Sequence, residues 1–262
     1  ADGGTRWMLA HGEAIRDGNG RVSAVRGTAA DITQRKLAEQ RVRRLTRLYA
    51  ALGDANAAVI QCRTQPELFR RLCEIVIDQA GLDLAWIGLT GDDGRIRPVA
   101  SHGSDLDYLE GIEISVNADD PHGRGPTGTA ARENRAVWID DFGSSAITVP
   151  WQQRAVAHGW QSSAALPIRR LGNSVGALTF YSKKPGGWHD EQVRNLLERI
   201  AEAINLALDK FAAAAETETS RQILAESEQR FRTLVEQSIA GAFIIRDNRF
   251  IYANPRMAQI LG

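Results

Sequence analysis

The stretch from Trp151 to Phe180 restricts the fold more than any other part of this sequence. It predicts a short helix over 151–158 and then two strands, 161–170 and 174–181, joined by a tight turn. Gly172-Asn173 in that turn suits a backbone with positive φ. The second strand alternates between its two faces as a half-buried strand does, through Val175, Ala177, Thr179 and Tyr181.

A second pair of strands is predicted upstream, at 84–92 and 95–102. Asp92 to Gly94 between them has the composition of a hairpin turn. Helical patterns occur before and after these strands, so the fold class is α+β, with an antiparallel sheet and helices on either side of it in the sequence.

Composition excludes several classes of partner. The 262 residues hold 32 basic and 32 acidic side chains, and this balance predicts no nucleic-acid partner. We interpret the basic run at 34–47 as one solvated face of a helix. No apolar run approaches the roughly 20 residues of a membrane span, and no signal peptide opens the chain. We therefore expect a cytoplasmic protein, with Cys62 and Cys73 as structural thiols.

The residues 34–60 predict a long helix with a heptad-like seam. Asp31 is its predicted cap and Gln34 completes a capping box. The seam suggests a parallel coiled-coil dimer whose register Asn56 fixes, although an amphipathic helix lying on its own domain has the same pattern. The seam residues are Val42, Leu45, Tyr49, Leu52, Asn56 and Val59.

Two further helices follow from the same reasoning. Thr64, Pro66 and Glu67 predict a capped helix start, and Gly81 its end. A second long helix is predicted from Trp188 to about residue 227, weakening over the alanine-rich stretch after residue 211. It repeats the seam spacing, which favours a homodimer through both long helices. Its seam residues are Val193, Leu197, Ile200, Ile204, Ala207, Phe211 and Ala214.

The section between the two predicted hairpins is rich in loops and is where we expect a ligand pocket. The helix start near Pro126 presents free N–H groups, so Gly125, Thr127 and Gly128 could hold an anion, although a plain capped helix start explains them better. Tryptophans in this section line either a pocket or the core. The candidate cavity residues are Trp86, His102, Gly125, Thr127, Trp138, Trp151, His158, Trp160, Ser162 and Ser163.

The two ends of the chain each contain an incomplete sheet. Residues 5–15 and 21–30 predict one hairpin, turning at 17–20. Near the other end, the strands 242–247 and 249–254 predict a second hairpin, turning at Asp247-Asn248, before a helix from Pro255. Two strands alone are only marginally stable, so we expect both ends to belong to larger sheets.

These ends resemble PAS domains, and the centre resembles a GAF domain of the kind found in bacterial histidine kinases and diguanylate cyclases or phosphodiesterases. Phe231, Tyr252-Ala253-Asn254 and the tripeptide Asp31-Ile32-Thr33 carry the PAS resemblance. The GAF resemblance implies a six-stranded antiparallel sheet with helices on one face and a cavity on the other. It is carried by 125–130, 138–141, 162–168, 176–178 and Trp188.

This resemblance implies a division into five segments. A PAS hairpin occupies 1–33 and a signalling helix 34–63. The GAF domain extends over 64–210, a linker helix over 211–228, and the N-terminal part of a second PAS domain over 229–262.

No catalytic set is recognisable, so we expect no enzyme in this fragment and an output kinase or cyclase outside it. His189-Asp190-Glu191 lacks the proline of a histidine-kinase phosphoacceptor. Neither cysteine has the position of a bilin attachment site. His102, His122 and His158 have the residue type for haem or metal, but isolated loop histidines are usually solvated, so no metal is assigned and the cofactor is unknown.

We expect a sensory module in which a small ligand binds the GAF cavity and biases the flanking helices. The alternative is a GAF domain that binds nothing and acts as a dimerisation spacer between PAS sensors. A cavity filled by its own tryptophans would favour the spacer.

Overall fold

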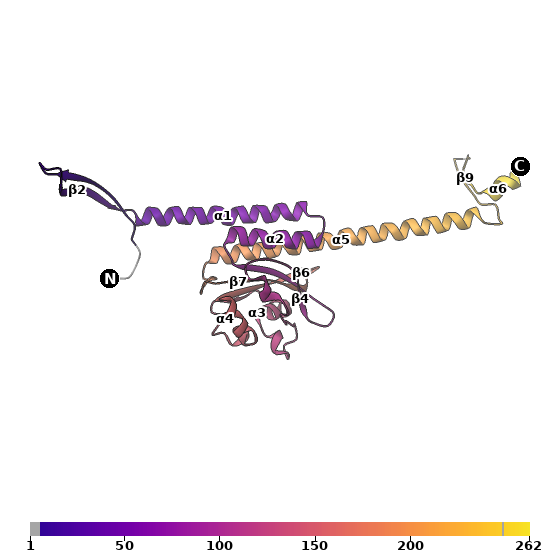
Figure 1. Ribbon diagram of the computed structural model, residues 1–262. Coiled ribbons are helices and arrows are strands. Elements are labelled where there is room, and N and C mark those ends of the chain that lie inside the picture. Colours follow the sequence, from indigo (N-terminus) through magenta and orange to yellow (C-terminus); the bar gives the residue numbers. More distant parts are fainter. Residues whose placement is uncertain (1–5, 248) are drawn as a thin grey trace. The chain divides into compact units, whose positions relative to one another are not determined.

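The structure is a computed structural model that describes residues 6–247 and 249–262 (Figure 1). The chain divides into two compact units between Leu206 and Ala207, within one long helix. The elements of the first unit are β1 Met8–Arg16, β2 Val22–Asp31, α1 Thr33–Gln61, α2 Gln65–Ala80, β3 Leu84–Thr90, β4 Ile96–Gly103, α3 Pro126–Glu133, β5 Val137–Ile139, α4 Gln152–His158, β6 Ser162–Arg170, β7 Asn173–Ser182 and the first part of α5 Glu191–Glu236.

The central sheet is antiparallel, with the strand order β4-β3-β7-β6-β5. Five strands form where the resemblance implied six. A sixth strand does not form beside β4, because the neighbouring segment makes only one bridge, between Arg95 and Ser115. This segment then turns away, where the N–H groups of residues 117 and 119 bond to side chains of their own loop.

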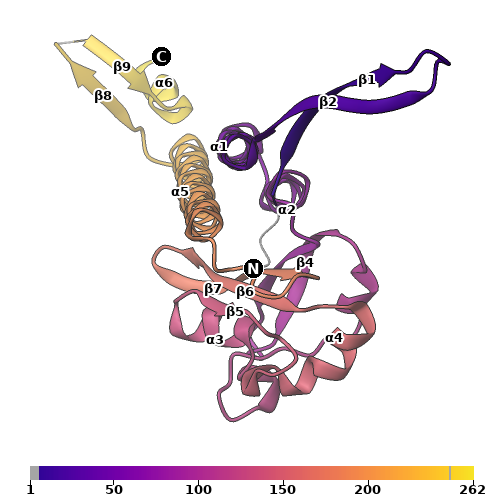
Figure 2. The ribbon, with the colours of Figure 1, turned by 90° about the vertical axis from the view of Figure 1, so that its left-hand side faces the viewer.

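The two faces of the sheet have different coverings (Figure 2). Cross-strand partners share a face, so the register separates the residues cleanly. Leu84, Tyr181 and Ser163 are partners on one face, which α3 and α4 cover. Ala85, Phe180 and Ala164 are partners on the opposite face, beneath α2 and the start of α5.

The face of the sheet beneath α2 and α5 is held by buried apolar side chains and by two hydrogen bonds. The Trp188 indole N–H donates to the carbonyl oxygen of Ile139 at 3.1 Å. The amide oxygen of Asn205 accepts the N–H of Arg169 at 2.7 Å. The segment before α5 is thereby fixed to β5 at the edge of the sheet, and α5 itself is fixed to β6 in the interior.

The hairpin between β6 and β7 differs from its prediction in the residues that take positive φ. Leu171 has φ 51° and Gly172 has φ 80°, whereas Asn173 is already the first residue of β7. The turn begins at Leu171 as predicted but ends one residue earlier, because the register shift between Ile168 and Arg169 places Arg170 opposite Asn173.

Two predicted capping boxes do not form, although Thr64 is the N-cap residue of α2 as predicted. α1 begins at Thr33 with Ile32 as its N-cap, and Asp31 accepts the N–H of Thr33 from outside the helix. At α2, the side chain of Thr64 makes no capping bond, and Glu67 accepts the N–H of Arg63 at 3.2 Å. Gly81 does end α2 with φ 72°, as expected. α5 continues without interruption to Glu236. The alanine-rich stretch after residue 211 does not weaken the helix, because alanine has the highest helix propensity.

The seam predicted in α1 lies beside its buried face. The face that packs inward consists of Leu48, Ala51, Ala55 and Ala58. Of the predicted seam, Val42 is 62% exposed and Tyr49 69% exposed. Leu45, Leu52 and Val59 are half-buried, so the stripe is only partly covered.

In the first half of α5, the predicted seam is not exposed for pairing with a second chain. Val193, Leu197, Ile200 and Ile204 are buried within the chain, because this face of α5 covers the sheet. The heptad spacing there reflects packing on the domain itself, and Phe211 is half-buried.

The second unit contains the rest of α5, β8 Phe243–Arg246, β9 Arg249–Ala253 and α6 Pro255–Leu261. Asn254 organises it. Its amide oxygen accepts the N–H groups of Ala242 and Met257, and its amide nitrogen donates to the carbonyl oxygens of Val235 and Ala240. Asn248, in the predicted turn, lies outside the described residues, as do residues 1–5, where the first strand was predicted to start.

Within the described residues, none of the helices has the length and apolar character that a membrane crossing requires.

Both cysteines are buried and unpaired, and we expect their thiols to be inert in the folded protein. Burial raises the pKa of the Cys73 thiol to about 12, so about one molecule in ten thousand carries its thiolate at pH 8. An aromatic disulfide reagent at pH 8 should leave Cys73 unmodified for hours and label both cysteines at once in guanidinium chloride. Rapid labelling of Cys73 in the native protein would contradict the packing of α2.

Candidate functional site

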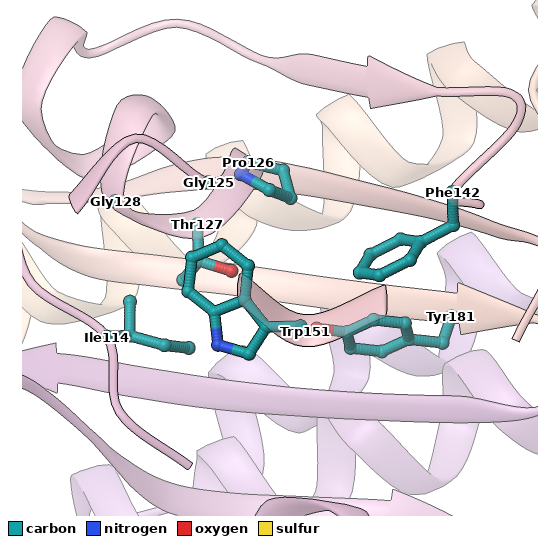
Figure 3. Close-up of a pocket in the computed structure, with 8 residues that line it drawn as sticks. All are labelled: Ile114, Gly125, Pro126, Thr127, Gly128, Phe142, Trp151 and Tyr181. Atoms are coloured by element: carbon teal, nitrogen blue, oxygen red, sulfur yellow. The ribbon is translucent and has the colours of Figure 1, made fainter. Parts of the chain in front are cut away.

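A small pocket lies between the sheet and the layer of α3 and α4, on the face opposite the long helices (Figure 3). Its free volume is about 10 Å³, the space of one water molecule. The side chains that surround it are uncharged. They are those of Ile114, Pro126, Thr127, Phe142, Trp151 and Tyr181, together with the backbone at Gly125 and Gly128.

Trp151 is the side chain that fills most of this space. Its six-membered ring lies so close to Gly125 that a Cβ on that glycine would come within 2.4 Å of it. Its indole N–H donates to the carbonyl oxygen of Glu113 at 3.2 Å, and the His122 ring packs edge-on at 6.0 Å. Trp151 precedes α4 in a segment that has its own turn structure, so it belongs to the covering layer and not to the sheet.

α3 is anchored to the sheet at its first turn. Thr127 and Thr179 share a buried hydrogen bond of 3.0 Å between their hydroxyl groups. Arg132, at the other end of the helix, donates to the carbonyl oxygen of Gly123 at 2.7 Å and so fixes the loop before it. These contacts hold the N-terminus of α3 against the pocket.

An aromatic cluster adjoins the pocket. The rings of Tyr108, Trp160 and Tyr181 lie 5.0–5.9 Å apart between centroids. Burial raises the pKa of Tyr108 to about 12 and that of Tyr181 well above its usual value, so both phenols stay protonated at neutral pH. His158 packs edge-on against Tyr108 and bonds to the carbonyl oxygen of Arg154.

Four polar atoms on this side of the sheet lack a well-formed hydrogen bond within the described residues. They are the indole nitrogens of Trp86 and Trp160 and the hydroxyls of Tyr108 and Ser163. All four side chains are buried, and the three aromatic ones belong to one core cluster with Tyr181 and Trp151. Tyr108 and Trp86 still interact with the Tyr181 hydroxyl. Trp160 and Ser163 have no such partner, and a buried polar group left in that state costs about 1–3 kcal/mol.

The structure brings seven of the ten sequence-predicted cavity residues to this side. Trp151, Gly125 and Thr127 line the pocket itself, and Trp86, Trp160, Ser163 and His158 lie in or against the adjoining cluster.

The other three predicted cavity residues lie on the opposite side of the sheet, beneath α2 and α5. Trp138 pairs with Ala164, and its ring packs against Trp188 at 5.8 Å. His102 pairs with Ala85 and lies 3.7 Å from Asp78 of α2. Ser162 donates to the carbonyl oxygen of Lys184. Adjacent strand residues point to opposite faces, which is why Ser162 and Ser163 separate.

Sequence reasoning missed several residues of the site. Tyr181 and Thr179 were recognised as strand residues in alternation, and that alternation with Ala177 already puts them on one face. Tyr108, Ile114 and Phe142 come from irregular segments, for which no periodic signal exists. Their place follows only from the way these loops cross the sheet.

The histidines named as metal or haem candidates do not converge. His102 is on the helix side of the sheet, whereas His122 and His158 belong to the other side. In residues 6–247 and 249–262, no three His, Cys, Asp or Glu side chains gather as a metal site would need.

The sequence of residues 62–209, more than half of the chain, matches the GAF domain family, and the chain therefore belongs to that family. Residues 229–262 match the PAS domain family. A GAF domain followed by a PAS match indicates a sensory or regulatory module. No curated protein gave a match to the sequence.

Solved structures share the fold at low sequence identity. The free methionine-R-sulfoxide reductase from Neisseria meningitidis, in complex with its substrate, has a TM-score of 0.53 at 15% identity, over 64% of this chain and 91% of that one. The A. Aeolicus nlh2 GAF domain in an inactive state has a TM-score of 0.50 at 16% identity, over 66% and 99%. The GAF domain from the Acinetobacter phosphoenolpyruvate-protein phosphotransferase has 0.50 at 13%, over 66% and 97%.

The likeness to the reductase corrects the expectation that this chain is no enzyme. That expectation rested on the absence of a familiar catalytic string, but the same fold occurs in a protein that is itself an enzyme. Function is located in sites and not in folds, so neither the fold nor the missing strings exclude catalysis here.

Proposed function

We propose that this chain is a sensory module whose GAF domain binds a small ligand beneath Trp151. The ligand is uncharged and mostly apolar. The four polar atoms beside the pocket that lack a well-formed hydrogen bond carry the proposal. Three are hydrogen-bond donors on aromatic side chains, those of Trp86, Tyr108 and Trp160. A ligand with acceptor atoms would pair with them, in surroundings that are otherwise apolar.

Trp151 would have to move for such a ligand to enter. The present free volume admits one water molecule, whereas a ligand of several heavy atoms needs the space that the indole occupies. Because Trp151 is held by one hydrogen bond and by packing, its displacement is a change that binding energy can supply.

Transmission through the helices is the second part of the proposal. The exposed stripe of α1, with Val42 and Tyr49, is continuous with a groove lined by Leu45, Leu52 and Leu196. A second copy of the chain pairing along this stripe would form a parallel dimer, and ligand-dependent changes in the domain would alter how α1 lies in it.

The filled pocket supports one alternative, the dimerisation spacer. A cavity occupied by its own tryptophan has no need of a ligand, and the GAF domain would then serve only to space two helices. In that case the unpaired donors are satisfied by water.

Native mass spectrometry of the full chain separates the two functions, with a variant that closes the pocket. Ser163→Leu adds bulk on the fully buried cavity face, so we expect it to abolish retention of a small molecule while the dimer persists. Ser163→Ala, which adds no bulk, is the matched control and should retain most of it. Equal retention by both variants would place the ligand elsewhere, and an empty wild-type dimer would favour the spacer.

A further inference from the structure

A large polar cleft lies on the opposite side of the GAF domain from the pocket. It is bounded by α1, by the end of α2 and by the loop between β7 and α5, and its volume is about 710 Å³. That volume is in the range of sites that hold a drug-sized or nucleotide-sized ligand. All of its walls belong to the first compact unit.

Basic side chains from two walls converge on this cleft. α1 contributes Arg43, Arg44 and Arg47, and the loop contributes Lys184. Asp190 is the carboxylate that lines the cleft, and it pairs with Arg44 at 2.6 Å. Arg43, Arg47 and Lys184 form no salt bridge with the described residues, although the carboxylate of Glu39, one helical turn before Arg43, lies close enough for the Arg43 guanidinium to help lower its pKa. The lining of the cleft therefore has a net positive charge that Asp190 and the neighbouring Glu39 balance only in part.

The end of α2 accounts for only part of this charge. Its last carbonyl groups, at Gln79 to Gly81, carry a partial negative charge of about half a unit and attract a cation. Arg47, Lys184 and the partly balanced Arg43 together exceed what these carbonyl groups can offset. Arg43 and Arg47 also stand one helical turn apart, a spacing at which like charges repel. An anion placed between the two walls would relieve this repulsion.

The remaining lining suits an organic ligand with an apolar part. Leu48, Leu82 and Val193 contribute apolar side chains to the same cleft, and Gln40 and Gln79 contribute amides. Arginine binds phosphate oxygens in a bidentate manner, and two arginines one turn apart span two neighbouring phosphate groups.

We propose that this cleft binds a diphosphate group, either inorganic or as part of a nucleotide. The phosphates contact Arg43, Arg47 and Lys184 and compete with Asp190 for Arg44. Binding joins α1 to the loop that precedes α5, and so fixes the position of one long helix relative to the other within the unit. The site is separate from the pocket under Trp151 and does not depend on a ligand there.

The test is calorimetric titration of the full chain with pyrophosphate, ADP and adenosine at low salt. We expect saturable binding of pyrophosphate or ADP, weakened at least tenfold by Arg47→Glu and weakened again by raising NaCl from about 50 to about 300 mM. Arg41→Glu is the matched control, because Arg41 is on the same helix but does not line the cleft. It should change the affinity less than threefold.

The relative affinities for pyrophosphate and ADP distinguish the two possible ligands. Equal affinity for pyrophosphate and ADP assigns an inorganic ligand, and tighter binding of ADP assigns a nucleotide whose base uses the apolar wall. The proposal is overturned by the absence of saturable binding at millimolar pyrophosphate and ADP, by binding of adenosine alone, or by equal losses in Arg47→Glu and Arg41→Glu. Circular dichroism on both variants confirms that the helices persist.

Discussion

Replacing Trp151 by alanine should lower the free energy of unfolding by about 3–4 kcal/mol and leave a cavity that indole refills. The side chain is buried, packs on Gly125, lines the pocket together with Tyr181, and donates one hydrogen bond to the carbonyl oxygen of Glu113. Its removal deletes all of these at once. An apolar cavity of this shape binds aromatic molecules, so millimolar indole should raise the melting temperature of Trp151→Ala by about 3 °C.

Urea unfolding and thermal melts with and without indole measure both effects. Val149→Ala is the control, because Val149 is two residues away in the same segment and 60% exposed. It should cost less than about 0.5 kcal/mol and show no response to indole. An equal response of both variants to indole would mean that indole binds the surface, and a loss below about 1 kcal/mol would contradict the packing of Trp151.

Replacing Tyr49 by glutamate should convert a dimer of this chain into a monomer. Tyr49 is 69% exposed and adjoins Leu45 and Leu52 in the α1–α5 groove. In a two-fold dimer the change introduces two charges into one apolar contact, because each copy supplies the same residue. We expect the dimer dissociation constant to rise about 100-fold, which corresponds to about 2.7 kcal/mol.

Analytical ultracentrifugation over a range of concentrations measures this constant. Ile60→Glu makes the same kind of change on the same helix at a side chain that is 75% exposed and outside the predicted seam. It should leave the dimer intact. Dissociation by both variants would mean that charge on α1 acts generally, and a wild-type chain that is monomeric at high concentration would eliminate transmission by a coiled coil.

Local signals in the sequence determined most of the fold. Alternation in 174–181, the glycine that ends α2 and the heptad spacing of both long helices each describe contacts between near neighbours in the chain, and the elements form where those signals lie. The GAF match at 62–209 and the PAS match at 229–262 agree with the order of those two motifs. The candidate pocket followed in part, since Trp151, Gly125 and Thr127 do line it.

Only the tertiary structure decided which face of the sheet each side chain occupies and what covers that face. A strand's two faces differ by one residue, so the side of Trp138 and His102 depended on cross-strand register, which no local pattern shows. The heptads of α5 look alike in sequence whether they cover their own sheet or another chain, and burial assigns Val193 and Ile200 to the sheet. Likewise the arginines of α1 appear in sequence as a solvated stripe. Only the approach of the 183–190 loop turns that stripe into one wall of a cleft.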